Sequence, residues 1–273
     1  MCVCVLNTKM LARKNPLKCD GRIVLTDDHR YVLDGKHQAP ISVTKAIEGQ
    51  ASHPFHARDV IRKHLVSWRS DASSKYHDVV RGKDDSDATS AVLAVWDATA
   101  AEGTSLHHQL ELMCNAEPCT EPDRHATELA QFGVLMRGME VKGHEPFRTE
   151  LSLMGLRGDG TPFVAGQLDL LTKDEVGRHH IVDFKRTDKD LDRKAPSYGK
   201  RVYGLPDNAH FRYSLQLSLY AELLLEQEGI DVASLTMAQM HPNLVMGKLT
   251  PATDLRPGAR ALLAQLREGT LAD

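Results

Sequence analysis

The hydrophobic pattern of this chain changes at Pro146 from a helical to a strand-like period. Upstream of this proline, apolar residues recur every three or four positions, as they do on one face of a helix. Downstream, short apolar runs are separated by glycine-bearing turns, which is typical of a strand meander. The runs predict strands at 147–153, 163–171 and 180–184, a helix at 211–228 and a further strand at 235–241. Three strands followed by a helix and another strand favour an α/β fold, with a mixed central β-sheet flanked by helices.

The remainder of the chain is mostly helical in pattern. The pattern predicts a short strand at 30–35, helices at 42–47, 57–68, 91–113, 125–142 and 258–268, and a polar loop at 70–90. We therefore predict four segments. They are an irregular basic tail at 1–28, a leader with a short strand and helices at 29–90, a core at 91–250 and a C-terminal helix at 251–273.

Two of the predicted strands carry one acid each, and a lysine follows the second acid. Asp169 lies in the apolar run 165–171, where an unpaired carboxylate is costly. Asp183 and Lys185 are two residues apart, so their side chains emerge on the same face of one strand. Two carboxylates beside an ammonium group form a site for a divalent cation and an activated water, which is the chemistry of phosphodiester cleavage. A salt bridge at a strand end is the alternative interpretation.

Two further residues are candidates for this site. Glu150 ends the predicted strand before the hairpin, where it is either a further ligand or orienter of water, or a solvated strand residue. His107 shares a helix face with Glu111 four residues later. A lone histidine on a helix is more often packed or exposed than a ligand. A zinc site at His107 and His108 is another alternative, although the His-Glu-x-x-His pattern of hydrolytic zinc sites is absent.

Polar and basic residues that follow the meander are candidates for contact with nucleic acid. Gln216 and Tyr220 lie on one helix face, where they either reach phosphates and base edges or complete hydrogen bonds at the edge of the core. The segment 185–201 is rich in lysine and arginine and directly follows the two acids. It is either a grip on the phosphate backbone or a solvated loop of mixed charge. The candidate cations are Arg186, Lys189, Arg193, Lys194 and Arg212.

Charge and cysteine content limit the setting in which such a site works. The net charge of -3 is not the basic balance of most nucleic-acid-binding proteins, so a surface for a polyanion has to be local. An odd number of cysteines, five, fits free thiols in a reducing intracellular compartment. No apolar run reaches the roughly 20 residues that span a bilayer. The basic start before Asp20 favours a disordered tail over an organelle-targeting segment, which is the alternative.

Five short motifs occur along the chain in one order. They are Gly103-Thr104-x-x-His107, Arg148-Thr149-Glu150, Gly166-x-x-Asp169, Asp183-x-Lys185 and Gln216-x-x-x-Tyr220. In this order and spacing they resemble the PD-(D/E)xK nuclease superfamily, in particular its RecB-like exonuclease branch. The resemblance spans residues 96–241. Residues 30–68 are also similar to the leader found in relatives of the mitochondrial genome maintenance exonuclease and in some viral nucleases.

The resemblance implies a restriction-endonuclease-like core and cleavage of DNA that depends on Mg²⁺ or Mn²⁺. It implies metal binding by His107, Asp169, Asp183 and the main-chain carbonyl of Val182, with Lys185 serving the attacking water and Gln216 and Tyr220 near the DNA. The chain departs from the family pattern at Leu168, where a proline is usual. Some relatives carry an iron–sulfur cluster with three downstream cysteines. No such cluster is expected here, because no cysteine follows Cys119.

Together these features lead us to expect a metal-dependent DNA nuclease of the kind used in DNA repair and recombination. An exonuclease that acts on free ends or single strands is the favoured form. A structure-selective endonuclease with the same site is one alternative. A nucleic-acid-binding module that no longer cleaves is another.

Overall fold

The computed structural model describes residues 10–26, 28–50, 55–194 and 205–269 of the 273-residue chain. The chain divides into two compact units. The first comprises residues 1–53 together with 107–273, and the second comprises residues 54–106. The long helix α5 (Asp85–Cys114) begins in the second unit and ends in the first. The segment boundaries predicted from the sequence stay a prediction.

The first unit is built on a five-stranded mixed sheet in the order β4-β5-β6-β7-β8. Strands β4 and β5, and β5 and β6, pair antiparallel, whereas β6 and β7 are parallel. β8 returns antiparallel to β7 at the edge of the sheet. The strands are β4 (Glu145–Leu156), β5 (Pro162–Lys173), β6 (His179–Arg186), β7 (Val232–Met240) and β8 (Lys248–Pro251). The predicted meander and the predicted mixed sheet are therefore confirmed.

Helix α7 (Ala209–Glu228) makes the crossover that the parallel pair β6 and β7 requires. It begins after Asn208, whose side chain accepts a hydrogen bond from the Phe211 amide. It ends at Gly229, which adopts the left-handed conformation with φ of 73°. Leucines along α7 are buried against the sheet, and α8 (Arg256–Glu268) packs on the same helix.

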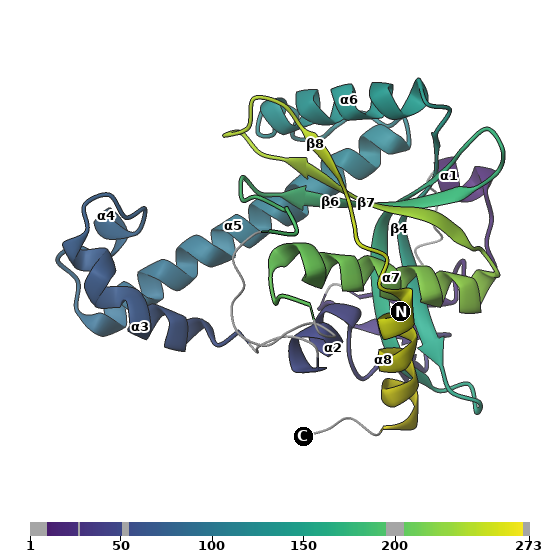
Figure 1. Ribbon diagram of the computed structural model, residues 1–273, viewed down its shortest axis with the longest axis horizontal. Helices are drawn as coiled ribbons and strands as arrows, with labels where there is room; N and C mark the ends of the chain where they lie inside the picture. The colour runs from purple at the N-terminus through teal and green to yellow at the C-terminus, as the bar shows by residue number, and fades with distance from the viewer. Residues whose placement is uncertain (1–9, 27, 51–54, 195–204, 270–273) are drawn as a thin grey trace. The chain divides into compact units, whose positions relative to one another are not determined.

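Helix α6 (Ala126–Glu140) lies on the opposite face of β6 and β7 from α7, as Figure 1 shows. Phe132 of α6 meets Phe184 of β6 edge to face, with ring centroids 5.3 Å apart. The short helix α1 (Met10–Lys14) packs on β4, where the Leu11 amide donates to Asn115. The sheet is thus covered by helices on both faces, as the sequence predicted.

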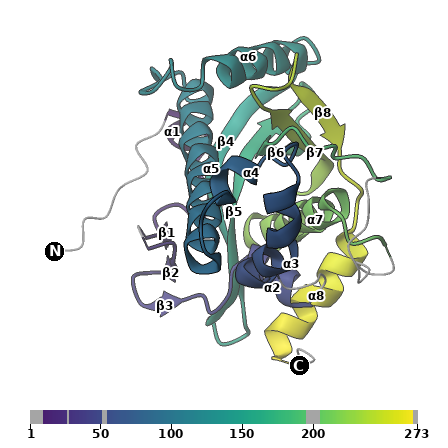
Figure 2. The ribbon, with the colours of Figure 1, turned by 90° about the vertical axis from the view of Figure 1, so that its left-hand side faces the viewer.

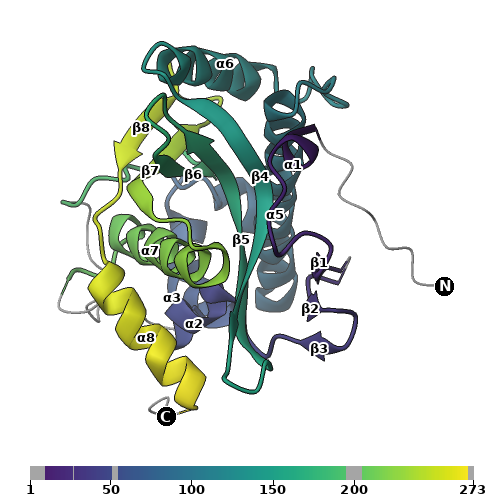
Figure 3. The ribbon, with the colours of Figure 1, turned by 90° about the vertical axis from the view of Figure 1, so that its right-hand side faces the viewer.

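The N-terminal leader forms a second, small sheet that packs on β4 and β5. Its strands are β1 (Ile23–Leu25), β2 (Tyr31–Leu33) and β3 (His37–Gln38). Figures 2 and 3 show this sheet on the opposite side of β4 and β5 from α8. After β3 the chain bridges Ser42 to Ala165 and continues into α2 (Val43–Gln50), which packs against α7. The leader therefore covers an edge of β5 that would otherwise present unpaired backbone groups.

The second unit is a helical hairpin with its own apolar cluster. It contains α3 (Ala57–Ser70), α4 (His77–Val80) and the first part of α5. Ile61 and Leu65 of α3 are buried in it, and the indole nitrogen of Trp96 donates to the Tyr76 hydroxyl over 2.7 Å. Within the described part of the chain, no helix has the length and apolar character needed to cross a bilayer.

Several elements differ from the sequence predictions. The predicted loop at 70–90 contains α4 and the start of α5, because Asp84 caps α5 by accepting from the Asp87 amide over 2.8 Å. The polar residues near the end of the predicted loop therefore form the start of α5. The helix predicted at 91–113 is continuous through Gly103 and begins earlier, at Asp85. A glycine within a helix costs only about 1 kcal/mol. Strands β1, β3 and β8 were not predicted, because strands this short depend on pairing with distant residues.

Candidate active site

The two predicted acids lie where β5 and β6 separate. The antiparallel pairing of these strands ends at Leu170↔Val182, whereas β6 remains paired with β7 as far as Arg186. Asp169 and Asp183 are the next residue on each strand beyond this last pair. Continued pairing would have placed them directly opposite each other, where side chains share one face of a sheet. The fork therefore places the two acids on neighbouring strands, each one residue beyond the last pair.

Asp169 is buried at this fork and is held by two contacts. Its Oδ2 accepts a hydrogen bond from the Phe184 amide over 2.6 Å. Its Oδ1 lies 3.4 Å from His107 Nδ1 on α5. Burial by itself raises the pKa of Asp169, but the attraction of His107 and Lys185 outweighs it and the pKa is lowered. Burial lowers the pKa of His107, and Asp169 more than compensates, so that this pKa rises to about 9.

Glu150 completes a group of three potential ligands. The pairs Thr149↔Leu170 and Leu151↔Leu168 flank it, so Glu150 stands opposite Asp169 across β4 and β5. Ligand atoms of His107, Glu150 and Asp169 all lie within 4.8 Å of one another. Glu150 also has a φ of 46°, a left-handed conformation that is rare and costly for a residue with a side chain. Strain of this kind persists where the surrounding structure imposes it.

The buried Asp183 forms an ion pair with the half-buried Lys185 beside this group. Lys185 Nζ lies 2.5 Å from Asp183 Oδ2 and 4.4 Å from the centroid of the Tyr213 ring. Burial raises the pKa of Asp183 to about 6, although Lys185 opposes that rise. Burial lowers the pKa of Lys185, but the nearby Asp183 carboxylate and Tyr213 outweigh it and the pKa is raised. Lys185 therefore stays an ammonium group, on the same face of β6 as Asp183.

Gln216 and Tyr220 connect α7 to this site. Gln216 Nε2 donates to the Tyr220 hydroxyl over 3.1 Å and to Thr44 Oγ1 of α2 over 3.3 Å. Tyr220 is buried, and burial together with the charge of Asp183 raises its pKa well above the usual value. Gly166 makes room for the Tyr220 ring, because a Cβ at that position would lie 2.6 Å from Tyr220 Cε1.

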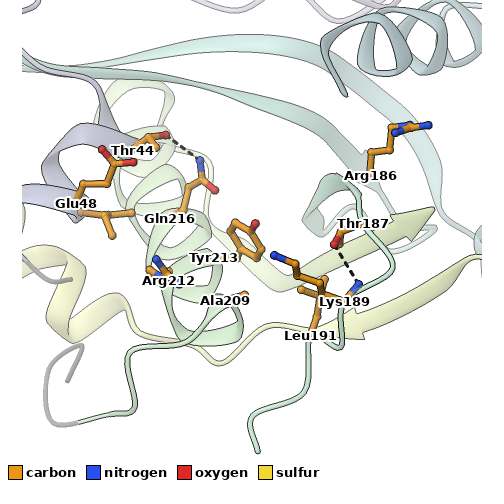
Figure 4. Close-up of a pocket in the computed structure, with 11 residues that line it drawn as sticks. Thr44, Glu48, Arg186, Thr187, Lys189, Leu191, Ala209, Arg212, Tyr213 and Gln216 are labelled. Carbon is orange, nitrogen blue, oxygen red and sulfur yellow. Dashed lines mark hydrogen bonds between the residues drawn. The ribbon is translucent and has the colours of Figure 1, made fainter. Parts of the chain in front are cut away.

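A cavity of about 470 Å³ is lined by several of the predicted nucleic-acid contacts. Arg186, Lys189, Arg212 and Gln216 all line it, as Figure 4 shows. Arg186 Nε is paired with Glu128 of α6 at 2.9 Å, and Arg212 Nε lies 3.3 Å from Asp207. Tyr213 also lines the cavity, so this ring joins the cavity to Lys185.

Other predicted contacts lie elsewhere. Arg193 and Lys194 are exposed and do not line this cavity. The end of the predicted basic segment, from residue 195 to 201, lies outside the described residues. Val182 is the last residue of β6 paired with β5, and its carbonyl stays a predicted ligand. Because backbone groups of alternate residues point to the same edge, the Phe184 carbonyl also faces the fork, beyond the last pair.

Three residues with clear roles in the geometry were not singled out from the sequence. They are Thr44, Tyr213 and Phe184. Tyr213 precedes Gln216 by three residues on α7, and this helical spacing was a signal that indicated a shared face. The contact of Thr44 with Gln216 joins residues 172 positions apart, and nothing in the local sequence indicates it.

The donor set suits a divalent cation. Carboxylate oxygens are the ligands that Mg²⁺ and Mn²⁺ prefer, and an imidazole suits transition metals. His107, Glu150 and Asp169 supply both types at one point, and Asp183 lies across the fork. The residues present therefore fit the metal that this arrangement of acids implies.

The chain was compared with protein families and with solved structures. A family model described as the PD-(D/E)XK nuclease superfamily matches residues 70–272. Among solved structures, the chain is similar to a protein designated SSO0001, at 11% identity and a TM-score of 0.29, over 53% of this chain and 59% of that one. It is also similar to a proposed exonuclease from Eubacterium rectale, at 11% identity and a TM-score of 0.38, over 85% and 82% of the two chains. No curated protein matches.

Proposed function

This chain belongs to the PD-(D/E)XK nuclease superfamily, and from that membership we propose that it is a metal-dependent deoxyribonuclease. The observation that carries the proposal is the fork between β5 and β6. There three potential metal ligands lie within 4.8 Å of one another, beside a half-buried lysine, Lys185, that is paired with the buried carboxylate of Asp183. Packing alone does not explain two buried carboxylates, Asp169 and Asp183, beside three partly buried titratable groups, because the burial of charge is costly.

We assign the metal to His107, Asp169 and Asp183, with Glu150 as a further ligand and a main-chain carbonyl of β6 completing the set. A bound Mg²⁺ or Mn²⁺ supplies a Lewis acid and lowers the pKa of water. The assignment is supported by the donor types and by the strained backbone at Glu150, which aims this carboxylate toward Asp169. The choice between Mg²⁺ and Mn²⁺ is part of the proposal. The histidine in the donor set favours Mn²⁺.

The protein's own residues then position the reaction. Lys185 holds a proton at Nζ and presents positive charge to the oxygens of the scissile phosphate and to the attacking water. Asp183 and the Tyr213 ring fix the direction of this ammonium group. His107 is kept in place by its contact with Asp169 and by the edge of the Phe184 ring, whose centroid is 5.7 Å away.

We further propose that the enzyme is an exonuclease of the RecB-like branch, which acts on free ends or single strands of DNA. The support for this finer assignment is the set of motifs around His107, Gln216 and Tyr220, together with a leader that adds α2 to the site. A structure-selective endonuclease with the same acids is the second candidate. For either form, the role that we propose is in DNA repair or recombination.

Digestion of matched linear and covalently closed circular single-stranded DNA tests this function. With Mg²⁺ or Mn²⁺, the linear strand is expected to be degraded to mononucleotides or short fragments while the circle stays intact. Cleavage of the circle at a comparable rate would replace the exonuclease assignment with the endonuclease. Retention of both substrates in gel-shift experiments without any turnover would show a binding module instead.

A further inference from the structure

The cavity in Figure 4 has a size and a set of walls that the assignment of the acids does not explain. It measures about 470 Å³, within the range of pockets that hold small ligands. Helix α2, the connection from β6 to α7, and α7 itself each contribute part of the wall. The α2 wall lies in the leader, outside the residues matched by the family model. A duplex is too wide for such a cavity, whereas one nucleotide is of suitable size.

The charge of the cavity favours an anion. Its wall carries three cationic side chains, Arg186, Lys189 and Arg212, against a single acid, Glu48. Glu48 is paired with Lys45 at 3.0 Å, Arg186 with Glu128 at 2.9 Å and Arg212 with Asp207 at 3.3 Å, so Lys189 is the cation of this wall that carries the argument. Within the described ranges the structure shows no acidic partner for the Lys189 ammonium group, which Figure 4 shows directed toward Tyr213. A phosphate group would supply the missing counter-charge.

Other residues of the cavity wall offer contacts that suit a nucleobase. The Tyr213 ring is part of the wall, and aromatic rings are stacking platforms for bases of unpaired strands. The Gln216 amide group donates to both Thr44 and Tyr220, and these two bonds fix its orientation. Its oxygen is thereby turned away from Thr44, as Figure 4 shows. An oriented acceptor of this kind suits the N–H groups of a base.

We propose that this cavity is a subsite for a single nucleotide of an unpaired strand, next to the acids. Lys189 and Arg212 contact its phosphate, Tyr213 stacks on its base and Gln216 accepts a hydrogen bond from it. Thr44 is a positioning residue, because it acts only through the orientation of the Gln216 amide. This inference rests on the proposed nuclease function, since the ligand is a unit of that substrate or its product.

Binding of a deoxynucleoside 5′-monophosphate to the full chain in excess chelator tests the subsite without any catalysis. Calorimetry or ligand-observed NMR measures its dissociation constant beside those of inorganic phosphate and of the deoxynucleoside. We expect the monophosphate to bind at least several-fold more tightly than either fragment, because both halves of the cavity contribute. Equal binding of inorganic phosphate would show a plain anion site, and an absence of monophosphate binding would also overturn the proposal.

Matched variants locate the binding site. Thr44→Val removes one hydrogen bond and is expected to weaken monophosphate binding by about threefold to tenfold. Thr44→Ser keeps the hydroxyl and should bind the monophosphate like the wild type. If Thr44 acted only by packing its methyl group, Thr44→Ser would weaken binding instead. Lys189→Gln should weaken binding of the monophosphate but not of the deoxynucleoside. Lys142→Gln, at an exposed lysine that does not line the cavity, is the control.

The outcomes separate this inference from the proposed function. Monophosphate binding that depends on Thr44 and Lys189, in a protein that cleaves no DNA, would support the subsite and contradict the nuclease. Metal-dependent cleavage in a protein whose monophosphate binding ignores both substitutions would support the nuclease and contradict the subsite.

Discussion

The ring of Tyr220 lies directly against Gly166, at a distance that leaves no room for a side chain on the strand. A Cβ at Gly166 would lie 2.6 Å from Tyr220 Cε1, and the Val43 side chain closes the same space at 3.1 Å. Gly166 begins the Gly-x-x-Asp motif and Tyr220 ends the Gln-x-x-x-Tyr motif. The two motifs therefore contact each other directly. This contact, together with Val43 of the leader, holds α7 and α2 close to the acids.

Gly166→Ala is therefore expected to displace the Tyr220 ring and to weaken the site. An added methyl group in a packed interior costs about 1–3 kcal/mol of unfolding free energy. Urea denaturation and DNA cleavage are both expected to show the loss. Gly158→Ala is the matched control, because nothing lies within 4 Å of a Cβ at that turn. Equal effects of the two substitutions would show that the Gly166 contact is unimportant.

Removal of the Glu150 carboxylate is expected to weaken metal binding. A ligand at one hundred times its dissociation constant stabilises the folded state by about 2.7 kcal/mol. Thermal unfolding with and without Mn²⁺ should show this gain in the wild type and lose most of it in Glu150→Gln. Glu145→Gln, an exposed acid of the same strand whose side chain is 64% accessible, is the control. A full Mn²⁺ shift in Glu150→Gln would exclude this residue as a ligand.

The left-handed backbone at Glu150 makes a separate prediction about stability. Because glycine adopts a positive φ without strain, Glu150→Gly should be more stable than Glu150→Ala by about 1 kcal/mol or more. Comparison of the two variants cancels the loss of the carboxylate, which they share. Chemical denaturation without metal gives the difference directly. An alanine variant as stable as the glycine variant would mean that the backbone is relaxed at this position.

The N-terminal segment is fastened to β4 by a buried ion pair, and its loss is expected to be costly. Arg148 is 1% exposed and lies 2.6 Å from Asp20. Asp20→Asn removes the charge that compensates a buried guanidinium, at an expected cost of about 3–5 kcal/mol. Asp34→Asn breaks an exposed pair with Arg22 and should cost less than about 1 kcal/mol. Denaturation midpoints of the two variants should differ clearly. Similar midpoints would contradict the importance of the buried pair.

Sequence reasoning identified most of the sheet, because strands that are buried on both faces have nearly continuous apolar runs. Asp169 was recognisable as unusual since it interrupts such a run. The alternation of side chains along a strand also placed Asp183 beside Lys185, as the structure shows at 2.5 Å. These features are local in the sequence, so a period and a spacing are sufficient to predict them.

The remaining features depend on contacts between distant residues. Glu150 stands opposite Asp169 with a left-handed φ, and nothing in its residue type signals this conformation. The hydrogen bond from Gln216 to Thr44 joins α7 to the leader across 172 positions. The cavity likewise exists only because three separate segments meet. A single sequence gives no means to predict which remote segments will do so.

The most direct test of the account is the rate at which the Lys185→Ala variant degrades end-labelled linear single-stranded DNA with Mg²⁺ or Mn²⁺. We predict a fall of about 10²- to 10³-fold relative to the wild type, because one preorganised donor to the reacting phosphate is lost. Lys248→Ala, at an exposed lysine 3.7 Å from Asp190, should cleave normally. Lys185→Ala leaves the buried Asp183 carboxylate without its partner, so circular dichroism is used to verify that the variant folds. The double variant Asp183→Asn, Lys185→Gln preserves the size of both side chains and is expected to be inactive as well. Wild-type rates in a folded Lys185→Ala variant and in this double variant would contradict the central claim.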